Sequence, residues 1–302
     1  MSWLIIAIIA YFLLAITNVN DKMILAKSLP QQSYLAYTFY VCFLGGLVIV
    51  MAPWGWGLIS WPFFLWALFG GALAVSSLFY FYKSLSNGQA SIILPFFGAA
   101  TAIFTLILSY LFLAEKLTTG QLGSFIFLII GIGLIALAGR EPGTKLNFYP
   151  FWLSTIAALL SGLYYVVTKY LFNELGFVNG FVWLRLFAAL LALALIIPRA
   201  NRQIIFAKTG ELTGKLKLLF VANQGIGATG FILVNYAISL ASVALVNALL
   251  GLQYAFVLVI VLVLGARRPR LTTEKNSGQV LITKILAIII IGLGLFCLAY
   301  FR

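Results

Sequence analysis

Polar side chains that could bind or carry a small solute lie inside long apolar stretches of this chain. Asn18, Asp21 and Lys22 are spaced i, i+3 and i+4, so in a helix they share one face. Tyr165 and Lys169 repeat this arrangement in the second half of the chain. A lysine ammonium group at such a position can pair with a carboxylate or phosphate, or it can extend from a helix end to the lipid headgroups. The sequence leaves both interpretations open.

Asp21 is the only acidic residue inside a helix that we predict. A carboxyl group held within a membrane can take up and release a proton, so Asp21 is our candidate for proton coupling. The alternative is a structural partner for a nearby lysine or backbone group. The chain contains no histidine, so a proton relay built on histidine is excluded.

Arg185 lies midway along an apolar run, where an arginine should face a protein interior or a watery cavity rather than lipid. Binding an anion and organising hydrogen bonds are both possible roles for it. Amide side chains in other apolar runs can read the donors and acceptors of a solute, or they can join helices. Our candidate substrate-binding residues are Asn18, Lys22, Tyr82, Tyr165, Lys169, Arg185, Asn235, Asn247 and Gln253.

Enzymatic chemistry finds no support in these residues. The chain has no paired carboxylates within its apolar runs, no HExxH motif and no nucleophile beside a general base. A zinc site would need ligands that the sequence does not provide. We therefore expect no enzyme, no metal and no cofactor.

The composition indicates an all-α integral membrane protein. Of the 302 residues, 64% are hydrophobic and only 8% are charged, whereas a soluble domain needs far more charge. Apolar runs of about 20 residues are long enough to cross a bilayer as helices. We predict ten such transmembrane helices, over residues 3–26, 32–51, 61–82, 91–113, 121–138, 151–172, 177–198, 216–240, 243–264 and 281–301.

The two halves of the chain resemble each other. FYFYKSL at 79–85 aligns with VNYAISL at 234–240, and IGIGLIALA at 130–138 aligns with IGLGLFCLA at 291–299. We predict a five-helix repeat over 1–139, a linker over 140–150 and a second five-helix repeat over 151–302. Because five is odd, the second repeat enters the membrane from the opposite side, so the repeats are inverted. Inverted repeats are typical of secondary transporters, which bind their solute between them.

Charge placement predicts the orientation. The net charge is +13, but the basic residues lie in short loops between apolar runs, so we expect no nucleic-acid partner. Of nineteen basic residues, only Lys116 and Arg302 lie on the face that carries the termini, while fourteen lie on the opposite face. The positive-inside rule then places both termini outside the cytoplasm.

Several short motifs occur in a recognisable order. They are FYKSL at 81–85, AS at 90–91, SYLFLAE at 109–115, LG at 122–123 and IGIG at 130–133. In this order the chain resembles the repeat of the drug/metabolite transporter superfamily, EamA type. Lys22 and Lys169 match the lysine that often ends the first helix of each repeat, and Arg185 matches an arginine common in the second.

The resemblance implies ten helices in two inverted repeats, with a central cavity lined mainly by the first four helices of each. It also implies secondary transport of small metabolites, amino acids, nucleotide sugars or drugs. The chain departs from the family pattern where Gly265, Ala266 and Arg267 replace the second acidic residue that would match Glu115. A proline common near Gln253 is also missing. Family members usually keep their termini in the cytoplasm, in contrast to the loop charges.

Taken together, we expect a secondary transporter, an exporter or exchanger, that works by alternating access in the plasma or inner membrane. Three basic groups against one acid within the helices favour a solute with an anionic group, such as an amino acid. The expected partners are this solute, the lipid bilayer and, if Asp21 titrates, protons, for a monomer or homodimer. The alternative is a channel or a membrane scaffold that transports nothing.

Overall fold

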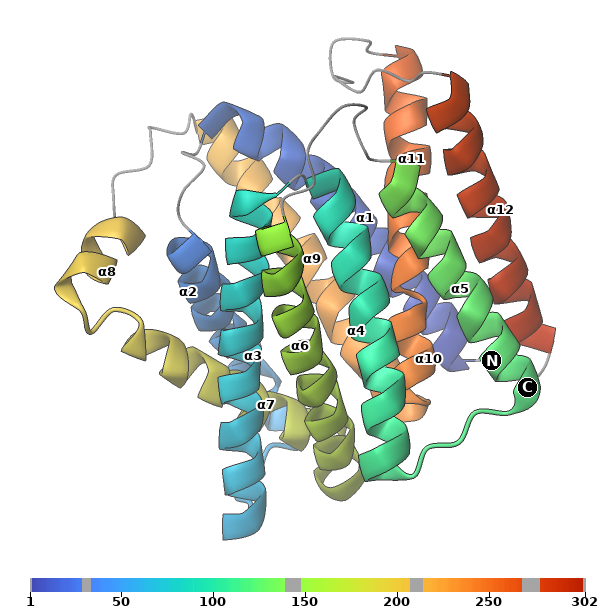
Figure 1. Cartoon of the computed structure of the whole chain (residues 1–302). Coiled ribbons are helices and arrows are strands. Elements are labelled where there is room, and N and C mark those ends of the chain that lie inside the picture. The colour runs from blue at the N-terminus through green and yellow to red at the C-terminus, as the bar shows by residue number, and fades with distance from the viewer. Residues whose placement is uncertain are drawn as a thin grey trace.

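The computed structural model describes residues 2–28, 34–88, 90–138, 148–206, 214–267 and 278–300. Within these ranges the chain is almost entirely helical and has no strand. The elements are α1 (Ser2–Ser28), α2 (Tyr34–Gly45), the 3₁₀ helix η1 (Gly46–Trp54), α3 (Trp61–Asn87), α4 (Ala90–Leu113), α5 (Thr119–Ala138), α6 (Phe148–Leu175), α7 (Phe177–Ala194), α8 (Arg199–Ile205), α9 (Gly214–Leu240), α10 (Val243–Ala248), α11 (Leu250–Arg267) and α12 (Gly278–Tyr300). Figure 1 shows them as one bundle with both chain ends toward the same end.

Membrane-length helices are present as predicted. Within the described residues, six spans are long and apolar enough to cross a bilayer: α1, α2 with η1, α3, α4, α6 and α7. Each of the ten predicted spans overlaps helix in the structure. The count of ten crossings and their inverted arrangement stay predictions.

Three details of the prediction were wrong. The span predicted over 243–264 is not one continuous helix, because α10 is separated from α11. The span predicted over 32–51 overlaps the apolar span Tyr34–Trp54, within which the α-helix α2 changes to the 3₁₀ helix η1. The short helix α8 was expected to be loop. In addition, α6 continues to Leu175, so Asp21 is not the only acidic residue within a helix, since Glu174 also lies in one. Hydropathy locates apolar runs but does not register local changes of helix type.

The outer surface of the bundle is apolar. Large hydrophobic side chains are exposed all around it, among them Phe69, Leu111, Ile126, Ile289 and Phe296. Polar side chains such as Thr38, Ser77 and Thr105 are instead buried. In water such a surface would promote association, whereas against lipid it is the expected one.

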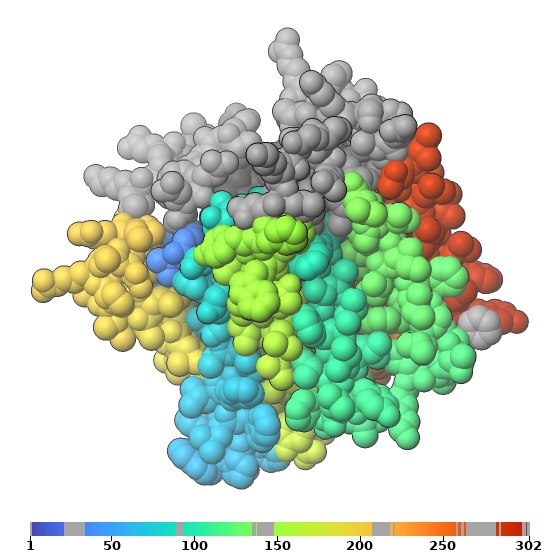
Figure 2. All heavy atoms as spheres, in the orientation of Figure 1, coloured from blue at the N-terminus to red at the C-terminus, as the bar shows by residue number. Residues whose placement is uncertain are grey.

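The main helix contacts join the two halves of the chain. α3 packs on α6 and α7, α1 packs on α9 and α11, and α5 packs on α12. In the space-filling view, α3, α6, α4 and α5 form a continuous wall with α12 at its edge (Figure 2). Any polar group on an inward face of these helices therefore meets residues from the other half.

Small residues permit the closest of these contacts. A Cβ atom added at Gly71 in α3 would lie 2.7 Å from the Cβ of Phe187 and 2.8 Å from the backbone nitrogen of Ala188. The backbones of α3 and α7 thus touch directly, as small residues allow in membranes.

Two faces of the bundle are referred to below. The termini face holds the start of α1, the ends of α6 and α9 and the start of α10 (Figure 1). The opposite face holds the ends of α1 and α3 and the start of α9 (Figure 1).

Candidate functional site

Arg185 is a charged residue inside the bundle. It lies midway along α7 and is 8% exposed. Its guanidinium carbon lies 4.8 Å from the ring centroid of Phe231 in α9, which is a cation–π distance. On another side it lies against Gly45, the last residue of α2, where an added Cβ atom would overlap the guanidinium. Arg185 therefore connects α2, α7 and α9.

The guanidinium of Arg185 has unused donors. Among the residues that the structure describes, it donates no hydrogen bond and meets no carboxylate. An arginine has five N–H donors, and a buried one that leaves them unsatisfied carries a large desolvation cost. A guanidinium with free N–H donors is suited to reversible binding of an anion.

The helix beside Arg185 changes its geometry at the point of contact. α2 is α-helical up to Gly45 and continues as the 3₁₀ helix η1 from Gly46. A Cβ atom at Gly46 would lie 2.8 Å from the Cβ of Ala189 in α7, so the two helices approach closely here. A stretch of 3₁₀ helix within a longer helix often marks a functional hinge.

Tyr165 lies near Arg185 and near two further tyrosines. Tyr165 in α6 is close enough to Arg185, Tyr11 and Tyr254 to interact with them electrostatically. The Tyr165 hydroxyl makes no hydrogen bond to any other described residue, although Tyr165 is only partly accessible. These four residues come from α1, α6, α7 and α11, so both halves of the chain contribute to the group.

The hydroxyl groups of Tyr11 and Tyr254 donate hydrogen bonds to backbone carbonyl oxygens next to irregular points in helices. Tyr11 donates to the carbonyl oxygen of Val246 at 2.8 Å, just before the break between α10 and α11. Tyr254 donates to the carbonyl oxygen of Leu94 at 2.6 Å, next to Pro95 in α4. Discontinuous helices within membranes expose backbone groups that need such partners.

Two buried amides have unused hydrogen-bonding capacity. Asn235 donates to the carbonyl oxygen of Phe231 at 2.9 Å, but its own side-chain oxygen is buried and unpaired within the described chain. Asn247 in α10 is 4% exposed, and its side-chain nitrogen likewise has no partner among the described residues. Buried groups of this kind need an explanation, and an absent solute or water is one.

Lys169 has a structural partner. Its Nζ donates to the carbonyl oxygens of Ile238 at 2.9 Å and Ser239 at 3.2 Å, in the last turn of α9. A cation at a helix C-terminus satisfies free carbonyl groups and complements the helix dipole. The ammonium group turns into the bundle, so extension to the lipid headgroups is not what the structure shows. A substrate role for Lys169 stays a prediction.

Glu115 completes this arrangement at the next helix. Its carboxylate accepts hydrogen bonds from the Ser242 hydroxyl at 2.7 Å and from the Val243 backbone nitrogen at 3.4 Å. Ser242 is the N-cap of α10, where an anion is favourable. Lys169 and Glu115 together hold the α9–α10 turn from both sides, and we call these contacts the turn clamp.

The termini face is also fastened at the loop before α3. The indole nitrogen of Trp183 donates to the carbonyl oxygen of Gly57 at 2.9 Å, and the backbone nitrogen of Gly57 donates to Asn179 at 3.2 Å. This loop is thereby held against the first turns of α7.

The remaining predicted residues are placed as follows. Asn18 in α1 is half-buried, and Tyr82 in α3 is half-buried with its ring 5.4 Å from that of Tyr37. Gln253 in α11 is buried beside Tyr254. Lys22 and the coupling candidate Asp21 belong to α1, but their side chains lie outside the described residues.

Sequence reasoning missed several residues of this region. Gly45 and Gly46 form a glycine pair inside an apolar run, which is a signal for a helix break that could have been used. Tyr254 stands next to the position where the resemblance leads one to expect proline. Phe231 and Tyr11 carry no signal that separates them from other aromatic residues of the chain.

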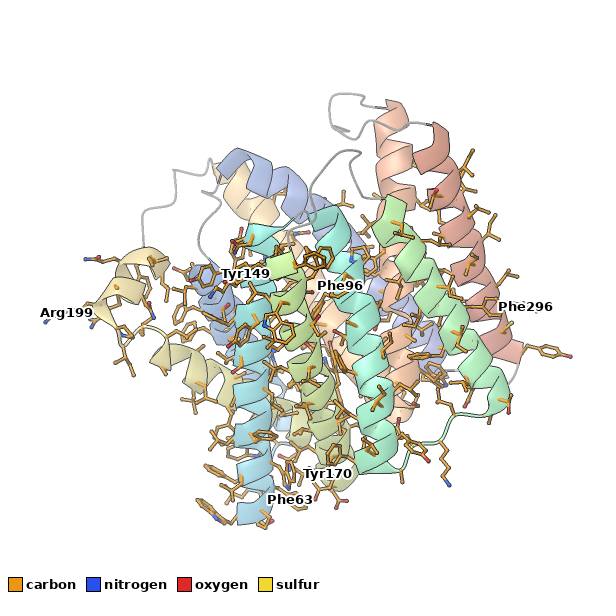
Figure 3. All side chains as sticks on the ribbon, in the orientation of Figure 1. Phe63, Phe96, Tyr149, Tyr170, Arg199 and Phe296 are labelled. Atoms are coloured by element: carbon orange, nitrogen blue, oxygen red, sulfur yellow. The ribbon has the colours of Figure 1, made fainter. Side chains whose placement is uncertain are left out.

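A surface groove lies away from these residues. It is lined by Pro62, Leu65, Trp66 and Phe69 on the outer side of α3. Figure 3 shows the neighbouring Phe63 and Tyr170 at the termini face, with ring centroids 6.3 Å apart. This apolar groove contains none of the candidate residues. The described residues also include no group of three side chains able to hold a metal ion.

Comparison with known proteins gives the fold and a family match over the first half of the chain. No curated protein sequence matches the chain significantly. A crystal structure of a protein superposes with a TM-score of 0.70 at 17% sequence identity, over 99% of this chain and 97% of that one, so the two share a fold. The family model described as EamA-like transporter family matches residues 1–137. This segment carries the helices from α1 to α5, so the first half of the chain is similar to the EamA-like transporters.

Proposed function

We propose that this protein is a secondary transporter that moves a small solute across a cell membrane by alternating access. In this proposal ten transmembrane helices form two inverted repeats, residues 1–139 and 151–302, joined by the linker 140–150. The family, the apolar outer surface and the helix contacts between the halves support it. The solute site would lie between the halves, around Arg185 and Tyr165.

One observation carries the proposal, and it is an asymmetry between helix pairs that the duplication makes equivalent. The internal sequence match relates α3 to α9, and by the same register α7 to α2 and α6 to α1. α7 packs along both α3 and α6, whereas in the described residues α2 packs along neither α9 nor α1.

In this proposal the asymmetry corresponds to a carrier that is closed at one face. The turn clamp lies at the termini face and α7 packs along α3, so the proposal takes the termini face as the closed one. The equivalent contact between α2 and the first turns of α9 would close the opposite face. A carrier with two inverted repeats is expected to exchange these two arrangements as it changes state.

A flux assay tests the proposal. Purified protein in liposomes would be preloaded with one unlabelled metabolite and tested for uptake of the same labelled metabolite, across amino acids, organic acids and sugar phosphates. We expect saturable counterflow with at least one compound. Ion conductance without saturation would indicate a channel instead, and folded protein without any flux would contradict transport.

A further inference from the structure

We propose that Arg185 and Tyr165 form the binding site for a carboxylate or phosphate group of the transported solute. This rests on the proposed function and adds the chemical class of the solute. The site lies where α2, α7 and α9 meet, at Gly45, Arg185 and Phe231.

The first argument is the unused capacity of two neighbouring polar groups. Arg185 is more than nine-tenths buried, and within the described chain its guanidinium donates no hydrogen bond. The Tyr165 hydroxyl, within electrostatic range of it, is also without a hydrogen bond to any described residue. An oxyanion between them would accept from both, in a charge-assisted arrangement.

The second argument is the way in which Arg185 is held. Phe231 covers one face of the guanidinium plane, and Gly45 leaves space beside it that any side chain would fill. A planar guanidinium that stacks on an aromatic ring keeps its edge N–H groups free, and these bind carboxylate or phosphate in bidentate fashion. A lysine in this place could not provide that geometry.

The third argument is the exposure of α9 beside Arg185. Gln224, Ala228 and Phe231 follow one another along one side of α9 at i, i+4 and i+7. Gln224 and Ala228 are exposed, and Phe231 is half-buried against Arg185. Within the described residues α2 does not pack along α9, so the proposal places the route of the anion on this side of α9.

The charge of Arg185 has a consequence for the transport cycle. When α2 closes on α9, Arg185 loses its remaining access to water. Enclosing an unpaired guanidinium within a membrane protein is costly, whereas a bound anion removes most of that cost. The loaded carrier should therefore close readily and the empty carrier slowly, so that exchange of anionic solutes is faster than net flux.

Ligand pairs that differ only in charge test the site. The probes are benzoate and benzamide, succinate and succinamide, phenylalanine and phenylalaninamide, and glycerol phosphate and glycerol. We expect the anionic member of at least one pair to raise the melting temperature of the purified protein and to exchange in liposomes. Its half-saturating concentration should rise about 100-fold or more in Arg185→Gln and about 10-fold in Arg185→Lys. Tyr165→Phe should show a smaller loss.

Controls separate the possible failures. Arg199→Gln removes an exposed arginine that points away from the bundle (Figure 3) and should leave anion binding unchanged. If Arg185→Gln does not fold, Gly45→Ala, which displaces the guanidinium without removing it, takes its place. Anion preference that survives in both Arg185 variants would overturn the inference while transport stands. Absence of flux for every probe in folded wild-type protein would instead remove the proposed transport function.

Membrane lipid is the other source of the same chemistry. The measurements would be made in phosphatidylcholine alone and with added phosphatidylglycerol. Selective stabilisation by soluble anions in phosphatidylcholine supports a solute site. Stabilisation that appears only with phosphatidylglycerol, and does so equally in Arg199→Gln, would assign the site to a lipid headgroup and overturn the proposal.

Discussion

At the scale of single residues, two buried cations of this protein have different surroundings. Lys169 donates hydrogen bonds to the carbonyl oxygens of Ile238 and Ser239, whereas Arg185 donates no hydrogen bond to any described residue. From sequence alone both were candidates for binding an anion. The partners that each one finds make Lys169 a stabiliser of the α9–α10 turn and leave Arg185 available to a ligand.

Replacing Lys169 should therefore reduce stability more than ligand affinity. Lys169→Met removes a charged donor and leaves two carbonyl oxygens without a partner, at a cost of about 1–3 kcal/mol in the free energy of unfolding. Thermal unfolding of the purified protein would measure the change, with the exposed Lys116→Met as control. Normal stability combined with a large loss of anion affinity would instead make Lys169 a substrate residue.

Asp21 remains our candidate for proton coupling. If its carboxyl group carries the coupled proton, Asp21→Asn should abolish uphill transport driven by a pH gradient and leave counterflow intact. Both can be measured in the same liposomes with and without the gradient. Uphill transport that continues in this variant would exclude Asp21 from coupling.

At the scale of elements, the close contact between α3 and α7 depends on the absence of a side chain. Gly71 lets the backbone of α3 touch α7 at Phe187 and Ala188. In contrast, a Cβ atom at Gly123 in α5 would meet nothing within 4 Å. Packing of this kind is the main force between helices in lipid, where the hydrophobic effect does not act.

A side chain at Gly71 should consequently force α3 and α7 apart. Gly71→Val would overlap backbone as well as side-chain atoms of α7, and we expect a loss of about 1–3 kcal/mol in stability. If the protein still folds, a cysteine introduced as Asn179→Cys, near the start of α7, should become more accessible to a membrane-impermeant thiol reagent. The control Gly123→Ala should change neither property. Unchanged packing in Gly71→Val would contradict the direct backbone contact.

At the scale of the whole molecule, two helix pairs that the internal sequence match makes equivalent differ in their packing. α7 packs along α3, whereas within the described residues α2 does not pack along α9. In the alternating access that we propose, the two pairs would exchange these arrangements to produce the opposite state.

Disulfide trapping would test this exchange of states. Cysteine pairs would join the first turns of α2 to residues 221–231 of α9, in a background without Cys42 and Cys297. We expect oxidation to link such pairs mainly during turnover, to stop transport, and to be reversed by a reductant. Efficient linkage that leaves transport unaffected would show that α2 and α9 do not form a moving gate. Labelling of single cysteines introduced into α8 (Arg199–Ile205), in intact cells, would determine the orientation of the termini.

We could predict the membrane character, the helical class and the approximate position of each helix from the sequence alone. These properties follow from hydropathy along short stretches of chain, which local composition sets directly. The resemblance to EamA-type transporters likewise followed from motifs within 79–133, and the family model matches residues 1–137. Buried amides and charges could be recognised as unusual for the same local reason.

Which of the buried polar and charged side chains contact each other, however, could be seen only in the tertiary structure. Lys169 finds carbonyl oxygens 69 and 70 positions away, and Glu115 reaches Ser242 across 127 positions. Arg185 reaches Phe231 and Gly45 because α2, α7 and α9 cross at one point. The rotation and crossing of packed helices depend on side-chain fit between distant segments, and no local pattern contains that information. The breaks at Gly45 and between α10 and α11 depend on the same long-range contacts.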